Sequence, residues 1–217
     1  MLIYINIKTM NTNTNTKPTR KYNARVQSDV KALTRQRILN AARDLFLEKW
    51  IDELTLQDVA RYAGVTVQTV IRHFGTREQL LHRAVEEIDL GARDHRREVV
   101  DGSLSGIVIA LVDYYEIYHA WVLRSLAQES RVPELSISLT KGRQQHRDWL
   151  LTCFAVYLNE VAEPDREKLI NQLYTLCEIY VWRVYRLDLN QSRSVLEAAW
   201  RSLLGAVIQY YSLVPVD

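Results

Sequence analysis

One stretch of the 217-residue sequence, residues 54–74, limits the fold more than any other. Thr55 stands just before an apolar run and Asp58 follows three residues later, which is the spacing of a capping box at a helix start. Gly64 follows where that helix has to end, because glycine adopts the left-handed backbone conformation without a Cβ clash. The pattern predicts a short helix between Thr55 and Gly64.

A second short helix is predicted directly after the first. Thr66 is placed to cap it, and Val70 and Phe74 form its apolar inner face. Ala60 is small at the point where the two helices have to approach each other. Two short helices joined by a three- or four-residue turn with a glycine form a helix-turn-helix, the motif that places its second helix in the DNA major groove.

A wider pattern surrounds this motif: a first helix ending in phenylalanine, an Ala-Gly-Val-Thr turn, an Arg-His-Phe sequence and an Arg-Glu-Gln-Leu helix start. The matching positions are Ala42, Leu45, Phe46, Ala63, Gly64, Val65, Thr66, Arg72, His73, Phe74, Arg77, Glu78, Gln79 and Leu80. Residues 34–81 thus resemble the DNA-binding domain of the TetR/AcrR family of bacterial transcriptional regulators. The resemblance covers about a quarter of the chain, and the remainder matches only in helical layout and length.

Two positions depart from the family pattern. Ile71 stands where the family usually has a tyrosine that touches a backbone phosphate, so that contact is expected to be missing. Arg77 replaces the usual lysine, which keeps the positive charge and the expected phosphate contact.

The helix-turn-helix assigns DNA contacts to particular residues. The second helix of the motif enters the major groove with its N-terminal residues, and the first crosses the backbone. The predicted base-reading residues are therefore Val67, Gln68 and Thr69. Gln68 is able to bond adenine bidentately, and Val67 to touch a thymine methyl. The predicted phosphate contacts are Thr34, Arg35, Thr55, Thr66, Arg72, His73 and Arg77.

The charge distribution agrees with an N-terminal DNA-binding part followed by a part that does not bind DNA. Residues 1–83 hold 14 basic and 7 acidic side chains, whereas residues 84–217 hold 14 basic and 19 acidic ones. A basic first part and an acidic second part suit a phosphate-binding module joined to a module that does not bind DNA. Cys153 and Cys177 lie on apolar helical stretches without metal-binding spacing, so buried, reduced thiols in a cytoplasmic protein are expected.

The sequence predicts an all-α fold in three parts. Residues 1–30 are interpreted as a disordered basic arm, with initiation at Met1 or Met10 left open. Residues 31–75 form the DNA-binding domain, whose first helix runs from Leu33 to near Lys49. Residues 76–217 form a helical effector-binding and dimerisation domain, with helices expected at 76–100, 104–129, 134–159, 164–187 and 192–212. No apolar run was expected to reach the length of a membrane span.

The last predicted helix carries a signal for a subunit interface. No charged side chain occurs between Ser202 and Pro215, and a helix that is apolar on most faces has to be buried on most faces. A central position within the monomer is the alternative reading. The family resemblance, in which the last two helices of each subunit pair, favours a homodimer. The predicted interface residues are Trp200, Leu203, Gly205 and Ala206.

An aromatic cluster in the body suggests a pocket for a small apolar or aromatic effector. Tyrosine and tryptophan supply an apolar wall with a polar handle. The predicted lining residues are Tyr114, Tyr115, Tyr118, Trp121, Trp149 and Phe154. Glu116, His119 and Gln128 are candidates for the polar groups. Ordinary core packing is the competing interpretation.

Enzymatic readings find little support in the sequence. Glu116 and His119 form a Glu-x-x-His unit, but a di-iron site needs a second copy. No metal site and no cofactor are predicted. The chain is expected to be a dimeric repressor that a ligand releases from a near-palindromic DNA operator. An activator or architectural factor without a ligand switch, and a helical-bundle enzyme or ligand carrier, remain as alternatives.

Overall fold

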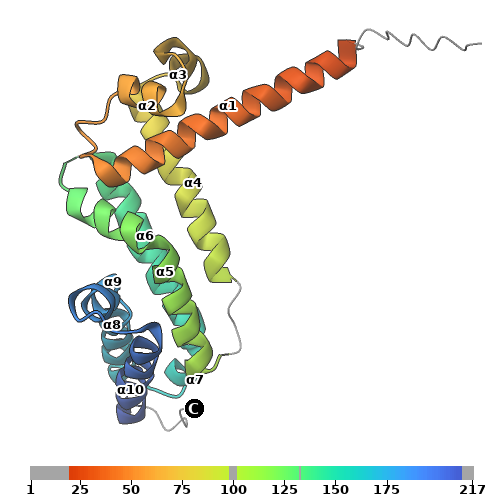
Figure 1. The fold of residues 1–217 in the computed structure, drawn as a ribbon. Helices are drawn as coiled ribbons and strands as arrows, with labels where there is room; N and C mark the ends of the chain where they lie inside the picture. Colours follow the sequence, from red (N-terminus) through yellow and green to blue (C-terminus); the bar gives the residue numbers. More distant parts are fainter. Residues whose placement is uncertain (1–19, 98–101, 132, 212–217) are drawn as a thin grey trace, which may run out of the picture. The chain divides into compact units, whose positions relative to one another are not determined.

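The computed structural model describes residues 20–97, 102–131 and 133–211, and all their regular structure is helical (Figure 1). The predicted all-α fold is confirmed for these residues. In chain order the elements are α1 (Arg20–Glu48), α2 (Leu56–Ala63), α3 (Val67–Phe74), α4 (Arg77–Arg97), α5 (Leu104–Gln128), α6 (Pro133–Cys153), α7 (Ala155–Leu158), α8 (Asp165–Leu176), α9 (Ile179–Arg183), the π-helical turn η1 (Val184–Asp188) and α10 (Arg193–Tyr211).

The first helix starts 13 residues earlier than the predicted start at Leu33. The interpretation of residues 1–30 as disordered is therefore wrong from Arg20 onward, while residues 1–19 lie outside the described residues. No glycine or proline occurs between Arg20 and Glu48, so nothing in the sequence interrupts helical hydrogen bonding there. The chain divides into two compact units between Arg37 and Ile38, within α1. In the first unit, Val30 and Leu33 are exposed.

A compact apolar cluster joins α1 from Ile38 onward to α2, α3 and the start of α4, and we call these segments the head. The predicted inner face of α1 is buried, because the spacing of Ile38, Ala42, Leu45 and Phe46 places all four on one side of the helix. Leu54 and Val59, which flank the start of α2, are buried in the same cluster. The α6 residue Leu135 also belongs to it, so the head shares core with the rest of the second unit.

Helices α5 to α10 form the body, around a second apolar cluster that includes Trp182 and Trp200. Two of its predicted helices are interrupted. The helix expected at 134–159 ends at Cys153, and the one expected at 164–187 ends at Leu176. Glu178 has an extended backbone (φ −71°, ψ 151°), which breaks that helix before α9 begins. Neither glycine nor proline marks this break, so the sequence pattern did not reveal it. The predicted domain boundary near residue 75 stays a prediction.

Helix α5 corrects one expectation about apolar runs. It contains an 18-residue window with a hydropathy of 1.2, so by length and composition it resembles a membrane span. The central helix of a water-soluble domain passes the same test. Residues along α5, among them Ile107, Leu111 and Tyr115, contribute to the body core. Both cysteines are buried free thiols, as predicted.

Candidate nucleic-acid interface and body cavity

The ends of the two motif helices have the predicted local chemistry. Thr55 and Asp58 form a complete capping box at the start of α2, and Gly64 ends that helix with φ 62°. The Thr66 hydroxyl accepts the backbone N–H of Thr69 at the start of α3 (3.1 Å). Each cap satisfies an N–H group that the helix leaves without a partner and stabilises it by roughly 0.5–2 kcal/mol. The turn is thus fixed by local interactions on both sides.

The outer side of α3 presents side chains that are available to a partner. Val70 and Phe74 are buried, whereas Gln68, Ile71 and Arg72 are exposed. The Gln68 carboxamide and the Arg72 guanidinium make no hydrogen bond or ion pair with the described residues. Val67 and Thr69 are half-buried, and the Thr69 hydroxyl shares a hydrogen bond with the Thr66 hydroxyl (2.9 Å). Of the three predicted base-reading residues, Gln68 therefore has the most accessible polar group.

Several predicted phosphate contacts have other roles within the protein. The Arg77 guanidinium donates to the backbone carbonyls of Ile51 and Leu54, so it closes the loop before α2 rather than pointing freely outward. The Thr55 hydroxyl donates to Asp58 (2.8 Å), and the Thr34 hydroxyl donates to the carbonyl of Val30 (2.8 Å). A phosphate needs a donated hydrogen, and the Thr55 and Thr34 hydroxyls already donate their only one, whereas the Arg77 guanidinium keeps further N–H groups but is anchored on the loop. Arg35 is exposed and His73 is half-buried.

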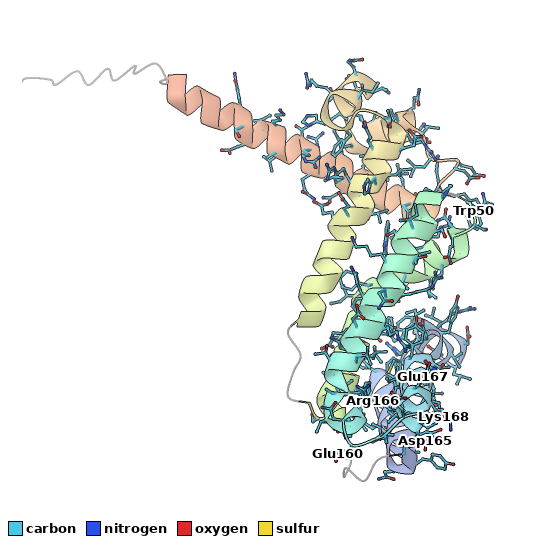
Figure 2. All side chains as sticks on the ribbon, turned by 180° about the vertical axis from the view of Figure 1, so that it is seen from behind. Trp50, Glu160, Asp165, Arg166, Glu167 and Lys168 are labelled. Carbon is cyan, nitrogen blue, oxygen red and sulfur yellow. The ribbon has the colours of Figure 1, made fainter. Side chains whose placement is uncertain are left out.

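The loop between α1 and α2 is tied to the end of α5. Trp50, labelled in Figure 2, lies between two guanidinium groups, with Arg124 4.4 Å and Arg131 4.0 Å from its ring centroid. Arg131 also pairs with Asp52 (2.8 Å) and thereby lowers the pKa of that carboxyl. The buried Gln128 carbonyl oxygen accepts the backbone N–H of Ile51. These contacts join the head to the body through a loop that the sequence analysis passed over.

A cavity of about 120 Å³ lies within the body, lined by residues of α5 and α6 and by the segment where α8 gives way to α9. A cavity of roughly 150 Å³ is large enough to bind benzene, so this one suits a compact molecule. Its lining residues are Tyr114, Tyr115, Tyr118, Trp121, Val122, Ser125, Leu126, Leu135, Ser138, Leu139, Gly142, Arg143, Gln145, His146, Tyr174, Glu178 and Ile179.

Four of the six predicted pocket residues line this cavity, namely Tyr114, Tyr115, Tyr118 and Trp121. The other two predictions are wrong for this cavity. Phe154 is fully buried in the body core, and Trp149 lies behind the wall, where its ring stacks on His146 with centroids 6.2 Å apart. The α6 residues that do line the cavity recur every three or four positions from Leu135 to His146, which a search for aromatic residues overlooks.

The predicted polar groups are also used elsewhere. The Glu116 carboxylate accepts hydrogen bonds from Arg186 (2.6 Å) and from the Trp182 indole (3.2 Å), and the Arg186 contact lowers its pKa. His119 stacks on Trp182 with ring centroids 4.4 Å apart. The Glu-x-x-His unit therefore joins α5 to α9 and η1. Within the part of the chain that the structure describes, no group of three or more potential ligands is placed to hold a metal ion.

Comparison with known proteins decides the family. Residues 38–84 match the model of the bacterial regulatory proteins of the tetR family. The chain is 36% identical over 112 residues to the HTH-type transcriptional regulator AlkX of Mycobacterium tuberculosis, covering 52% of this chain and 49% of AlkX. It is 32% identical over 87 residues to the regulator SrpR of Pseudomonas putida, covering 37% of this chain and 38% of SrpR. Residues 38–84 of this chain thus form a DNA-binding domain of the tetR family.

These relatives extend beyond the matched region, since the chain spans about half the length of AlkX and less of SrpR. The solved structure of Salmonella enterica GusR shares the fold more widely. It has 22% sequence identity and a TM-score of 0.65, and the match covers 81% of this chain and 95% of GusR. The named relatives are regulators of transcription, in agreement with the expectation that the chain is not an enzyme.

The predicted dimer residues of this chain separate onto two sides of α10. Trp200 is 0% exposed, and its indole donates to the Leu176 carbonyl (2.8 Å) inside the subunit. Gly205 is buried as well, so neither residue is accessible to a partner on the surface of this subunit, and the predicted interface stays a prediction. Trp200 and Gly205 lie on the inner side of α10. Leu203 and Ala206 are exposed on its other side, with Tyr210 81% exposed.

Proposed function

We propose that this chain is a homodimeric, cytoplasmic repressor of transcription that binds a near-palindromic DNA operator and is released from it by a small molecule. The accessible outer side of α3 carries the DNA-binding part of the proposal. Two caps and Gly64 hold α3 in place, while Gln68 and Arg72 offer polar groups that no described residue uses. A helix held in this way by the preceding helix is the element that reads the major groove in other helix-turn-helix proteins.

In the proposed complex, Gln68 reads one base and the residues on either side of it contact adjacent bases. Its carboxamide matches the donor and acceptor of adenine in the major groove, and Val67 and Thr69 contact adjacent bases. Backbone phosphates are held by Arg35, Thr66, Arg72 and His73. We leave out Thr55 and Thr34, because their hydroxyl hydrogens are used inside the protein, and Arg77, because its guanidinium is anchored on the carbonyls of Ile51 and Leu54.

In vitro selection from random duplex DNA, followed by mobility-shift titration at several salt concentrations, tests this assignment. Gln68→Ala is expected to cost roughly 1–3 kcal/mol of binding and to relax the preference at one base position. Arg72→Ala is the matched control, expected to weaken all sequences alike and to reduce the salt slope by about one. If both variants lose affinity uniformly, Gln68 does not read a base.

Two residues that line the cavity also contact the head. This contact supports the proposal of a ligand switch. Trp121 lines the cavity and packs on Phe46 of α1, with ring centroids 4.2 Å apart. Leu135 lines the cavity and belongs to the head cluster, where it also borders a hollow beside Leu81 and Val85 of α4. A ligand that fits the cavity better in one head position than in another shifts the population toward that position.

This route reaches α4 indirectly. No described side chain of α4 lines the cavity, so a ligand reaches α4 through Leu135. An activator or architectural factor without a switch is the second candidate function. Release of the selected DNA by a compound that also raises the melting temperature of the free protein favours the repressor, whereas stabilisation without release favours the second candidate.

A further inference from the structure

The charges around the cavity are unequally balanced. Arg143 and Glu178 are its oppositely charged lining residues, and the buried imidazole of His146 lines it as well. The Arg143 guanidinium forms a two-pronged pair with the Glu129 carboxylate, through Nη1–Oε1 (2.8 Å) and Nη2–Oε2 (2.6 Å). This pairing raises the pKa of Arg143 and lowers that of Glu129, so both groups stay charged and their charges cancel. The positive charge of the lining is therefore already satisfied.

Glu178 places a second carboxylate at the cavity. It precedes α9, but its carboxylate makes no capping hydrogen bond with that helix, and it acts electrostatically on Arg143, which is already paired with Glu129. Its neighbour is Tyr174, another lining residue, whose pKa is raised to about 12 by burial and by the hydrogen bond to Glu178. The phenol thus stays a neutral donor beside the carboxylate. Two carboxylates, those of Glu129 and Glu178, thus stand beside the single Arg143 guanidinium, so acidic groups are in excess at this end of the cavity.

The aromatic wall adds to this preference. Tyr114 and Tyr118 lie one turn apart on α5 with ring centroids 5.1 Å apart, and Trp121 continues the same side of the helix. The face of an aromatic ring carries the negative end of its quadrupole and attracts cations, most strongly for tryptophan. A wall of this composition beside a carboxylate favours a positively charged guest over a neutral or negative one.

A buried hydroxyl completes the set. Ser125 lies one turn after Trp121, lines the cavity and is 3% exposed, and its Oγ has no hydrogen-bond partner among the described residues. A buried hydroxyl without a partner costs free energy, so a guest that bonds to it gains affinity. An ammonium N–H group supplies the hydrogen that this oxygen accepts.

We infer that the cavity binds a small organic cation, an amine-type ammonium on a single ring or a similarly compact apolar body. The cationic group pairs with Glu178 and donates to Ser125, while the apolar body packs against Tyr118 and Trp121. The inference rests on the proposed function, because it names the chemical class of the effector.

Three probes of similar shape test the charge preference: benzylamine, which is protonated at neutral pH, neutral benzyl alcohol and anionic benzoate. Calorimetric titration into the full chain without DNA is expected to show benzylamine binding roughly tenfold or more tightly than benzyl alcohol, with benzoate weakest. In Glu178→Gln the advantage of benzylamine over benzyl alcohol should disappear. In Ser125→Ala benzylamine should weaken severalfold.

Two further variants sharpen the result. Glu129→Gln removes the counter-charge of Arg143, so benzoate should gain affinity relative to the wild type. Glu160→Gln changes an exposed carboxylate that does not line the cavity and should leave all three affinities unchanged (Figure 2). Thermal melting identifies any variant that does not fold. If a variant does not fold, the order of the three probe affinities in the wild type and the effect of Ser125→Ala test the inference.

The inference is overturned if benzoate or benzyl alcohol binds the wild type as tightly as benzylamine, if no probe binds, or if folded Glu178→Gln keeps the preference. Failure of the proposed function looks different. Benzylamine that binds with the predicted preference but leaves the selected DNA bound contradicts the ligand switch and supports the cation site.

Discussion

Ile71 is a residue whose replacement is expected to raise DNA affinity. Its side chain is 40% exposed on the outer side of α3, at the position where the family usually has a phosphate-binding tyrosine. Ile71→Tyr is expected to raise affinity about two- to tenfold for every sequence, the effect of one neutral hydrogen bond. The salt slope should not change, because no charge is added. Mobility-shift titration with Ile71→Phe as the hydroxyl-free control checks this, and a changed base preference would place residue 71 against a base.

Asp58 gives the head a defined response to acid. Hydrogen bonds from Thr55 and Lys49 lower the pKa of its carboxyl to about 2, against an ordinary value of 3.8 in the unfolded chain. A lowered folded-state pKa adds stability that is present above the unfolded value and is lost as pH falls toward the folded value. In urea unfolding, the difference between wild type and Asp58→Asn should therefore be full at about pH 5 and shrink toward about pH 2. A difference that stays constant with pH would show that the charge of Asp58 does not matter.

Among the elements, α5 connects the cavity to the head, and Phe46 tests that connection from the head side. Phe46 packs on Trp121 but does not line the cavity. Phe46→Leu should leave ligand affinity without DNA unchanged while reducing the effect of the ligand on operator affinity by about 0.5–2 kcal/mol. Tyr118→Ala should instead weaken ligand binding itself. By linkage, the effect of DNA on ligand affinity must fall by the same factor in Phe46→Leu. If Phe46→Leu keeps the full effect of the ligand on operator affinity, the coupling runs through Leu135 and α4 instead.

The same elements show what the sequence was able to predict. Caps and Gly64 act within a few residues, so the positions of α2 and α3 follow from local pattern. The cavity depends on contacts between distant segments. Glu178 enters its lining because the chain turns at an unmarked break after α8, and Gly142 and His146 enter it because of the rotation of α6 about its axis. These positions are set by tertiary packing, which overrides local preference.

For the whole molecule, the proposed dimer depends on the outer side of α10. Leu196, Trp200, Leu204 and Ile208 recur every four residues and fill the core, so the apolar character of that side is explained within one subunit. A single sequence does not separate this side from the exposed side, since both are apolar. Exposed Leu203, Ala206 and Tyr210 remain for a partner, and Tyr180 and Val184 are exposed on α9 and η1.

Leu203→Glu tests this interface without disturbing the subunit core, which Gly205→Glu would disturb. A carboxylate buried in the contact costs several kcal/mol unless it is paired, so sedimentation should show a monomer. One head makes too few DNA contacts for specific binding, and affinity should fall toward the non-specific range of about 10⁻⁴–10⁻⁶ M. Ile137→Glu, at an α6 position that is 71% exposed, is the matched control and should remain dimeric. A folded Leu203→Glu dimer would place the interface elsewhere.

The rate at which the two buried thiols react with a labelling reagent measures how often the body opens. The chain has two cysteines and both lie in the body, so a thiol-specific reagent reports on that part of the molecule alone. Burial raises the pKa of the Cys177 thiol, and an alkylating reagent therefore has to wait until the segment opens. The Cys177 carbonyl accepts the Tyr115 hydroxyl at 2.8 Å, immediately beside the cavity residues Glu178 and Ile179. A guest that holds this wall closed would slow the labelling, so occupancy could be followed by mass spectrometry without adding a dye or a tag.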